Sequence, residues 1–341
     1  MNVMMQKVHG SENDFFLLDE TQFERSLTAE EIEQLRIQLC SRETGLLAGA
    51  DGLLLVGEGT HGTSNARMRV INSDGSEASM CGNGLRTVAR YLAEKNQEKS
   101  FTVETMFADL KVRQAPNLAE EVATYQVEIS PVSFEAVTIP MHLGVQTLID
   151  EIIPALSKTI RFTAVAVPNP HLVAFVDHET LNGPEFERIA TYVNNENPYF
   201  PEGINVSFVE ILGKNQLFVR TYERGVGFTS ACGTAMCASS LLYTLLKDGV
   251  FYEEITVKNT GGMVKTVVHE TSDGSYWMEL IGNATITHLI EGSLTDLLHG
   301  AFEKITITET NDRNIIKNFC KHFLKNNNCS LIKRSFILQL C

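Results

Sequence analysis

The stretch Ser79-Met-Cys-Gly-Asn-Gly-Leu-Arg-Thr-Val-Ala-Arg90 decides how the first half of this chain folds. The residues from Leu85 to about Glu94 are apolar on most faces of a helix, and such a helix is normally buried in a core. Gly82 and Gly84 allow other groups to approach the backbone closely where that helix starts. The pattern therefore predicts a cysteine, Cys81, at the entrance of a buried helix.

A second stretch, Ser230-Ala-Cys-Gly-Thr-Ala-Met-Cys-Ala-Ser-Ser240, repeats this arrangement. It leads into another helix that is apolar nearly all round, predicted at residues 234–247. Cys232 follows Cys81 by 151 residues, and Asn169 follows Asn13 by 156, each asparagine in a turn ahead of its half. Similar offsets favour duplication of one α/β unit over a chance likeness between short glycine-containing strings.

Short strand patterns surround both helices and come in the same order. In the first half, strands are predicted at residues 6–9, 15–19, 52–56, 66–72, 101–104, 110–113 and 125–129, with a helix from the Thr28 capping box to about Cys40. In the second half, strands are predicted at residues 162–167, 172–176, 204–210, 217–222, 255–258, 264–269 and 276–281, with a helix at 184–194. The sequence thus predicts two related α/β (α+β) domains, residues 1–130 and 131–300, and a tail at 301–341.

Composition excludes several classes of protein. The formal net charge is −14, which disfavours a general nucleic-acid surface or an anionic membrane surface as partner. No apolar run approaches the roughly 18 residues that span a bilayer, and no secretory signal is recognisable at the N-terminus. The seven cysteines form no CxxC pair, so neither a disulfide framework nor a zinc site is expected. We therefore expect a soluble cytoplasmic protein without a bound metal.

The tail has a different charge balance from the rest of the chain. Residues 301–341 hold seven Lys or Arg against three Asp or Glu, a net charge of +4. We expect a peripheral helix followed by a poorly ordered end, and a basic membrane anchor is the disfavoured alternative.

The two Cys-Gly pairs carry the chemistry that the sequence suggests. A helix start offers unpaired N–H groups and positive potential, which favour a thiolate and lower a cysteine pKa below its free value of roughly 8.5. The same N–H groups hold a carboxylate well. A lone cysteine here would ordinarily be a small buried hydrophobic residue, but two in matched contexts indicate an acid/base pair. Facing each other, one sulfur would remove a proton from a stereogenic carbon and the other would return one, without a cofactor.

Six strings in order match a known family. They are His9-Gly-Ser-Glu-Asn-Asp-Phe15, Asn72-Ser-Asp-Gly-Ser76, Met80-Cys-Gly-Asn-Gly84, Pro168-Asn-Pro-His171, Gly203-Ile-Asn-Val206, and Glu223-Arg-Gly-Val-Gly227 leading to Ala231-Cys-Gly-Thr234. Over about residues 3–290 the chain resembles the diaminopimelate epimerase family. The resemblance implies that each half is a curved, mainly antiparallel sheet around a buried central helix, with the active site in the interdomain cleft. It also implies a cofactor-independent homodimeric isomerase that interconverts LL- and meso-2,6-diaminopimelate for lysine and peptidoglycan precursor synthesis.

By this resemblance the catalytic residues are four. Cys81 and Cys232 are the acid/base pair, and His171 and Glu223 orient and tune them. Taken singly, His171 would be a structural histidine, and Glu223 would form a surface ion pair with Arg224. The substrate-binding set that the resemblance implies is Asn13, Asn72, Gly82, Asn83, Asn169, Asn205, Glu223, Arg224, Gly233 and Thr234. Within this set, Arg224 would bind the distal carboxylate of the substrate through two parallel hydrogen bonds.

The chain departs from the family pattern at two places. Where many members have Phe-Asp-Gln, this chain has Ala50-Asp-Gly52, and Phe228 replaces the glutamate that usually precedes the second cysteine. Substrate preference is therefore open, and the alternatives are another cofactor-independent racemase of this fold, for instance on histidine or proline, and a non-catalytic amino-acid binding protein. Which sulfur rests as the thiolate is also open.

One further motif is similar to a dinucleotide-binding loop. Gly57-Glu-Gly-Thr-His-Gly62 fits GxGxxG, but a strand pattern follows it where a pyrophosphate-binding loop needs a helix. We expect a hairpin loop there.

Overall fold

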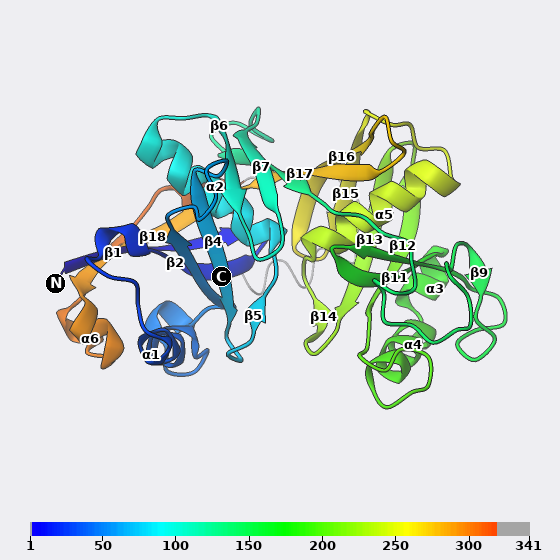
Figure 1. Ribbon diagram of the computed structural model, residues 1–341, viewed down its shortest axis with the longest axis horizontal. Helices are drawn as coiled ribbons and strands as arrows, with labels where there is room; N and C mark the ends of the chain where they lie inside the picture. Colours follow the sequence, from blue (N-terminus) through cyan, green and yellow to red (C-terminus); the bar gives the residue numbers. More distant parts are fainter. Residues whose placement is uncertain (1, 319–341) are drawn as a thin grey trace. The chain divides into compact units, whose positions relative to one another are not determined.

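The computed structural model describes residues 2–318 (Figure 1). Its described residues divide into two compact units, one formed by residues 2–127 and 282–318, and the other by Glu128–Ile281. Residues 282–300, which the sequence analysis assigned to the second half, thus cluster with the first unit. Among the described residues, no helix is long and apolar enough to cross a membrane.

The first unit is a mainly antiparallel sheet with two parallel pairings. Its strands are β1 (Asn2–Gly10), β2 (Asn13–Asp19), β3 (Gly52–Gly57), β4 (Ala66–Asn72), β5 (Glu77–Ala78), β6 (Ser100–Glu104), β7 (Asp109–Gln114) and β8 (Thr124–Ile129). β1–β2, β3–β4, β4–β5, β6–β7 and β7–β8 pair antiparallel, whereas β2–β3 and β4–β6 are parallel. Helix α1 (Ala29–Cys40) lies between β2 and β3 in the sequence and opens with the predicted Thr28–Glu31 capping box.

The second unit repeats this order of elements. Its strands are β9 (Glu151–Ile152), β10 (Arg161–Val167), β11 (Asn169–Phe175), β12 (Asn205–Gly213), β13 (Gln216–Glu223), β14 (Gly227–Thr229), β15 (Glu254–Asn259), β16 (Gly262–Glu270) and β17 (Tyr276–Asn283). β10–β11, β12–β13, β13–β14, β15–β16 and β16–β17 pair antiparallel, whereas β11–β12 and β13–β15 are parallel. Helices α3 (His178–Asn182) and α4 (Pro184–Asn194) precede β12.

The two lists of pairings match strand for strand. In each unit, one parallel pair encloses the first helical connection and the other encloses the long buried helix. This common order of strand directions supports the duplication that the cysteine and asparagine offsets suggested. The α+β fold class expected from the sequence is confirmed.

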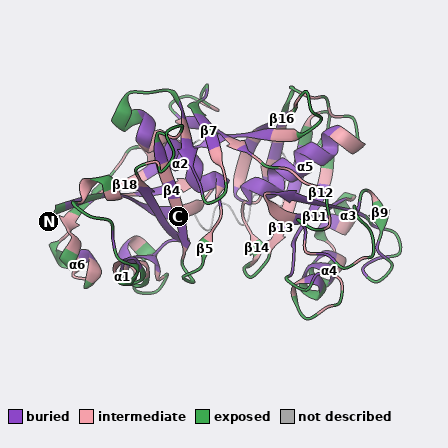
Figure 2. Cartoon of the chain, viewed as in Figure 1, coloured by how far each residue is buried: buried purple, intermediate pink, exposed green. Residues whose placement is uncertain are grey.

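The long helices α2 (Gly82–Asn96) and α5 (Gly233–Leu246) lie in the cores of their units. The residues 233–244 of α5 are all buried, and α2 is buried along most of its length (Figure 2). α2 starts three residues before the predicted Leu85, at Gly82. Gly84 allows the start of α2 to pack closely against Leu54 of β3, because a Cβ at position 84 would lie 2.8 Å from the Leu54 Cδ2 atom.

The chain after β17 contains elements that the sequence analysis did not predict. β18 (Thr285–Ser293) pairs antiparallel with β1 along its length, β19 (Thr306–Glu309) pairs with β18, and α6 (Leu294–Leu298) lies between them in the sequence. Leu297 of α6 belongs to an apolar cluster with Leu35 and Leu39 of α1. Residues 312–318 are helical, and residues 319–341 of the predicted tail lie outside the described residues.

Gly52 offers a test of this packing. A Cβ at Gly52 would lie 2.3 Å from the Ile71 carbonyl oxygen on the paired strand, so Gly52→Ala should force the β3–β4 backbone apart. We expect a loss of about 1–3 kcal/mol in the free energy of unfolding, measured by urea denaturation. Gly62→Ala is the matched control, because nothing lies within 4 Å of its Cβ position. Equal stability of the two variants would contradict this account.

Candidate active site

Cys81 is the N-cap residue of α2. Its backbone is extended (φ −138°), and its sulfur accepts a hydrogen bond from the Gly84 N–H at 3.4 Å. A sulfur therefore satisfies one of the N–H groups that a buried helix start leaves without an intrahelical partner. Gly82, the first residue of the helix, is buried beside it. The predicted position of the first cysteine is confirmed.

Asn13 brings the β1–β2 hairpin to this sulfur. The Cys81 thiol donates to Asn13 Oδ1 at 3.5 Å, and the Asn83 amide donates to the same oxygen at 3.3 Å. The hairpin turns through Ser11 and Glu12, both with positive φ, and Gly10 pairs with Asn13. The structure thus brings two predicted site residues, Cys81 and Asn83, into contact with a third, Asn13.

Asp51 completes this group, although the sequence analysis gave it no role. Its carboxylate accepts from Asn13 Nδ2 at 2.7 Å and from the Asp14 backbone N–H at 3.1 Å. Arg42 donates to Asp51 and to Asp14, each at 2.6 Å. The sequence signal for Asp51 is its place in the Ala50-Asp-Gly52 string, which departs from the family pattern at the next residue.

Asn72 ends strand β4, opposite Gly52 of β3. Its side-chain amide donates to Ser76 Oγ at 3.0 Å within its own turn. The next residue, Ser73, donates its backbone N–H to the Asp51 carbonyl oxygen at 2.8 Å. The fold therefore ties the Asn72 turn to the segment that holds Asn13.

Cys232 is the N-cap residue of α5 in the second unit. Its sulfur lies 3.4 Å from the Thr234 hydroxyl, and that hydroxyl lies 3.1 Å from His171 Nε2. His171 comes from β11 and is completely buried, and burial lowers its pKa to about 3. The ring is therefore neutral near pH 7. The first two residues of α5, Gly233 and Thr234, are also buried.

The Cys232 thiol contradicts one expectation from the sequence. We expected the helix start to lower both cysteine pKa values, but the pKa of Cys232 is raised well above its usual value. Burial is the largest cause, and the Glu223 carboxylate adds to it by charge and by a hydrogen bond. The Thr234 hydroxyl and the Ala235 N–H act in the opposite direction and are outweighed. Thr229, another residue that was not predicted, donates to Glu223 at 2.5 Å.

Of three further predicted residues in the second unit, Asn169 and Asn205 lie on the neighbouring strands β11 and β12, and Arg224 lies in the turn after β13. Asn205, at the start of β12, accepts the Arg224 backbone N–H at 2.9 Å and pairs in register with His171. Asn169 begins β11 and is half-buried. The Arg224 side chain is 43% exposed, and its ion pair is with Glu202, at 3.9 Å. The register brings Asn205 next to the buried histidine.

Phe228, the second departure from the family pattern, belongs to an aromatic group. It packs edge-on against Phe186 and Tyr222, with ring centroids 5.1 and 5.2 Å apart. The Arg220 guanidinium lies 5.1 Å from its ring. The substitution therefore replaces a carboxylate by packing contacts.

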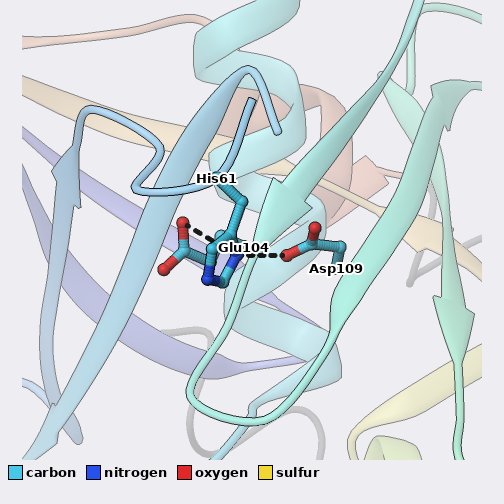
Figure 3. Close-up of side chains that lie close together, drawn as sticks. All are labelled: His61, Glu104 and Asp109. Atoms are coloured by element: carbon cyan, nitrogen blue, oxygen red, sulfur yellow. Dashed lines mark ion pairs between the residues drawn. The ribbon is translucent and has the colours of Figure 1, made fainter. Parts of the chain in front are cut away.

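A group of His61, Glu104 and Asp109 lies outside both cysteine centres (Figure 3). The His61 ring lies 3.8 Å from Glu104 and 3.6 Å from Asp109. Thr60 donates its N–H and its hydroxyl to Glu104, each at 2.6 Å. These bonds attach the loop between β3 and β4 to the end of β6. This loop is the hairpin loop that the sequence analysis predicted in place of a dinucleotide site. We interpret the group as contacts that hold this loop in place.

Comparison with known proteins gives a consistent result. A family model described as diaminopimelate epimerase matches residues 5–127 and 163–286. A diaminopimelate epimerase of Enterococcus faecalis is 97% identical over 319 residues, 94% of this chain and 98% of the relative. One of Ligilactobacillus salivarius is 59% identical over 91% of this chain and 96% of the relative. A solved PhzF-family phenazine biosynthesis protein of Bacillus anthracis has a TM-score of 0.61 at 17% identity, covers 86% of this chain and 99% of its own, and supports the fold alone.

Burial of His171 predicts a pH dependence of stability. The unfolded ring binds a proton near pH 6.5 and the buried ring only near 3, so the stability is complete above 6.5 and falls as the pH drops towards 3. Between pH 7 and pH 5, His171 should account for about 2 kcal/mol of the fall in unfolding free energy. His171→Gln should remove that part of the fall, measured by urea denaturation at both pH values. The same substitution at exposed His178 is the control, and equal pH slopes in both variants would refute the assignment.

Proposed function

The chain belongs to the diaminopimelate epimerase family, and on this premise we propose that it interconverts LL- and meso-2,6-diaminopimelate by proton transfer between two thiols. The observation that carries the proposal is a cysteine at the N-cap of the buried helix in each of the two units. A single capping cysteine would have a structural explanation. Its recurrence at the same point of a duplicated fold is what two-base chemistry requires.

The proposed reaction is balanced without any further reactant. A thiolate removes the α-proton and becomes a thiol, while the other thiol gives its proton to the opposite face of the carbon and becomes a thiolate. Configuration at that carbon is inverted, and the enzyme is left with its proton on the other sulfur. The reverse reaction restores the first state. Because only protons are transferred, neither sulfur forms a bond to carbon.

The difficult step is the removal of a weakly acidic proton. The negative charge that develops on the substrate carboxylate needs N–H donors fixed in advance, and the starts of α2 and α5 supply them at Gly82, Asn83, Gly233 and Thr234. Burial of these residues reduces competition from water, which strengthens each hydrogen bond to the developing charge.

The second centre is suited to hold its proton at rest. Burial and the Glu223 carboxylate both favour the Cys232 thiol over its thiolate. His171 is neutral and orients Thr234, whose hydroxyl lies next to the sulfur. We assign His171 and Glu223 as positioning residues of this centre, and Cys81 and Cys232 as the two acid/base residues of the reaction.

The remaining predicted residues would bind the substrate. Asn13, Asn72, Asn83, Asn169 and Asn205 offer both donors and acceptors to ammonium and carboxylate groups. Arg224, whose side chain is exposed, would bind the distal carboxylate. The proposal extends to work in the cytoplasm, where the thiols of Cys81 and Cys232 stay reduced, and to assembly as a homodimer.

Replacement of either sulfur tests the proposal. Cys81→Ala and Cys232→Ala should each lower the turnover of LL-diaminopimelate by about 10²–10⁴-fold, because each removes one of two required proton carriers. Cys40→Ala, at a buried cysteine of α1, is the matched control and should keep its activity. Deuterium incorporation at the α-carbon in D₂O reports the chemistry directly. Rapid turnover by either site variant would refute the two-thiol reaction, and lack of deuterium incorporation by the unaltered protein would indicate a binding protein.

Arg224 tests the substrate assignment. Arg224→Lys should raise KM about tenfold while changing kcat little, because an ammonium cannot replace a bidentate guanidinium on a carboxylate. Arg188→Lys on α4 is the control, since Arg188 bonds to Leu156 and Glu185. Steady-state kinetics with LL-diaminopimelate gives both constants, and an unchanged KM would remove Arg224 from the substrate contacts.

A further inference from the structure

The Asn13 side chain ends in an amide, and the hydrogen-bond partners decide where its carbonyl oxygen and its NH₂ group lie. Rotation of the amide exchanges a donor for an acceptor in nearly the same position. One end lies 2.7 Å from Asp51 Oδ2, and the other lies 3.5 Å from the Cys81 sulfur. The sulfur therefore meets either a carbonyl oxygen or an NH₂ group, depending only on the amide orientation.

The Asp51 carboxylate decides between these two orientations. A carboxylate only accepts hydrogen bonds, so at 2.7 Å it requires the NH₂ end of Asn13, and an oxygen placed there would be repelled. The Asn83 amide, which donates to Asn13 Oδ1 at 3.3 Å, agrees with the same choice. The carbonyl oxygen of Asn13 is therefore directed to the Cys81 sulfur.

Asp51 is itself held in place from two directions. Arg42 Nη2 donates to its second oxygen, Oδ1, at 2.6 Å and also to Asp14. The Asp14 backbone N–H donates to Asp51 Oδ2 at 3.1 Å, and the Asp51 N–H donates back to the Asp14 carbonyl at 3.0 Å. The carboxylate thus cannot turn away from Asn13 without breaking several bonds.

The orientation has a consequence for the proton on Cys81. A thiol can donate to a carbonyl oxygen, whereas a thiolate next to that oxygen is disfavoured and would prefer an NH₂ group. We propose that Asp51 is a positioning residue that fixes the Asn13 amide with its carbonyl towards Cys81, so that this sulfur holds a proton more strongly than it would beside an NH₂ group. This inference rests on the proposed two-thiol function and names the residue that sets the proton state of its first sulfur.

The test follows the ionisation of Cys81 without using turnover. Cys81 is half-buried, and iodoacetamide reacts with the thiolate, so the pH midpoint of its alkylation reports the thiol pKa. Mass spectrometry of the Cys81 peptide separates this residue from the other cysteines. In Asp51→Asn the Asn13 amide can turn its NH₂ group to the sulfur, and we expect the midpoint to fall by about one pH unit. Asp109→Asn, with its bond to Thr63, is the matched control in the same unit and should leave the midpoint unchanged.

A second background separates amide orientation from loss of charge. If Asp51→Asn acted only through the loss of charge, it would lower the Cys81 pKa equally with and without Asn13. In an Asn13→Ala background, Asp51→Asn should therefore leave the midpoint unchanged if Asn13 transmits the effect. The same shift in both backgrounds, or no shift in either, would overturn the proposal. Asp51→Ser, which also frees the amide, provides a second variant if Asp51→Asn folds poorly.

Activity assays distinguish this inference from the proposed function. If the unaltered protein turns over LL-diaminopimelate but Asp51→Asn leaves the Cys81 midpoint in place, only the role of Asp51 fails. If the midpoint moves as expected but the protein incorporates no deuterium into the substrate, the proposed reaction fails instead. Where both hold, the limb of the pH profile of kcat/KM that reports Cys81 should move with the alkylation midpoint.

Discussion

A helix that starts inside a protein core leaves backbone N–H groups that need acceptors, and water cannot supply them. Both long helices of this chain start in that situation, and each has a cysteine at its N-cap. At α2 the sulfur accepts the Gly84 N–H, and at α5 it lies beside the Thr234 hydroxyl. Each N-cap sulfur therefore lies beside N–H groups that also suit a carboxylate.

The duplicated fold gives two equivalent positions with different surroundings. Cys81 meets an amide carbonyl from a hairpin, and Cys232 meets a carboxylate and a threonine hydroxyl in a fully buried setting. Because the backbone is repeated and the neighbours are not, the proton affinity of each sulfur can be adjusted separately. A reaction that runs in both directions with one proton to share needs such independent adjustment.

The residues around the first sulfur show how polar groups act through one another. Arg42 fixes Asp51, Asp51 fixes the amide of Asn13, and Asn13 faces the sulfur. In the second unit, His171 reaches the sulfur through Thr234. His171 is neutral because burial makes its charged form costly, so it acts by hydrogen bonding and not by charge.

Local patterns in the sequence predict several features of this fold. The Thr28 capping box, the β3–β4 hairpin and the two buried helices after Cys81 and Cys232 follow from short-range spacing, and the matched offsets indicated a repeat. The tertiary structure decided what depends on distant partners. β18 is a strand because it pairs with the first strand of the chain, and Asp51 matters because a parallel pairing brings it to Asn13. The raised pKa of Cys232 likewise required the burial and the Glu223 contact, since the helix start alone favours the thiolate. Spacing along a chain fixes periodicity and capping, but only folding sets burial and the distances between groups on separate strands.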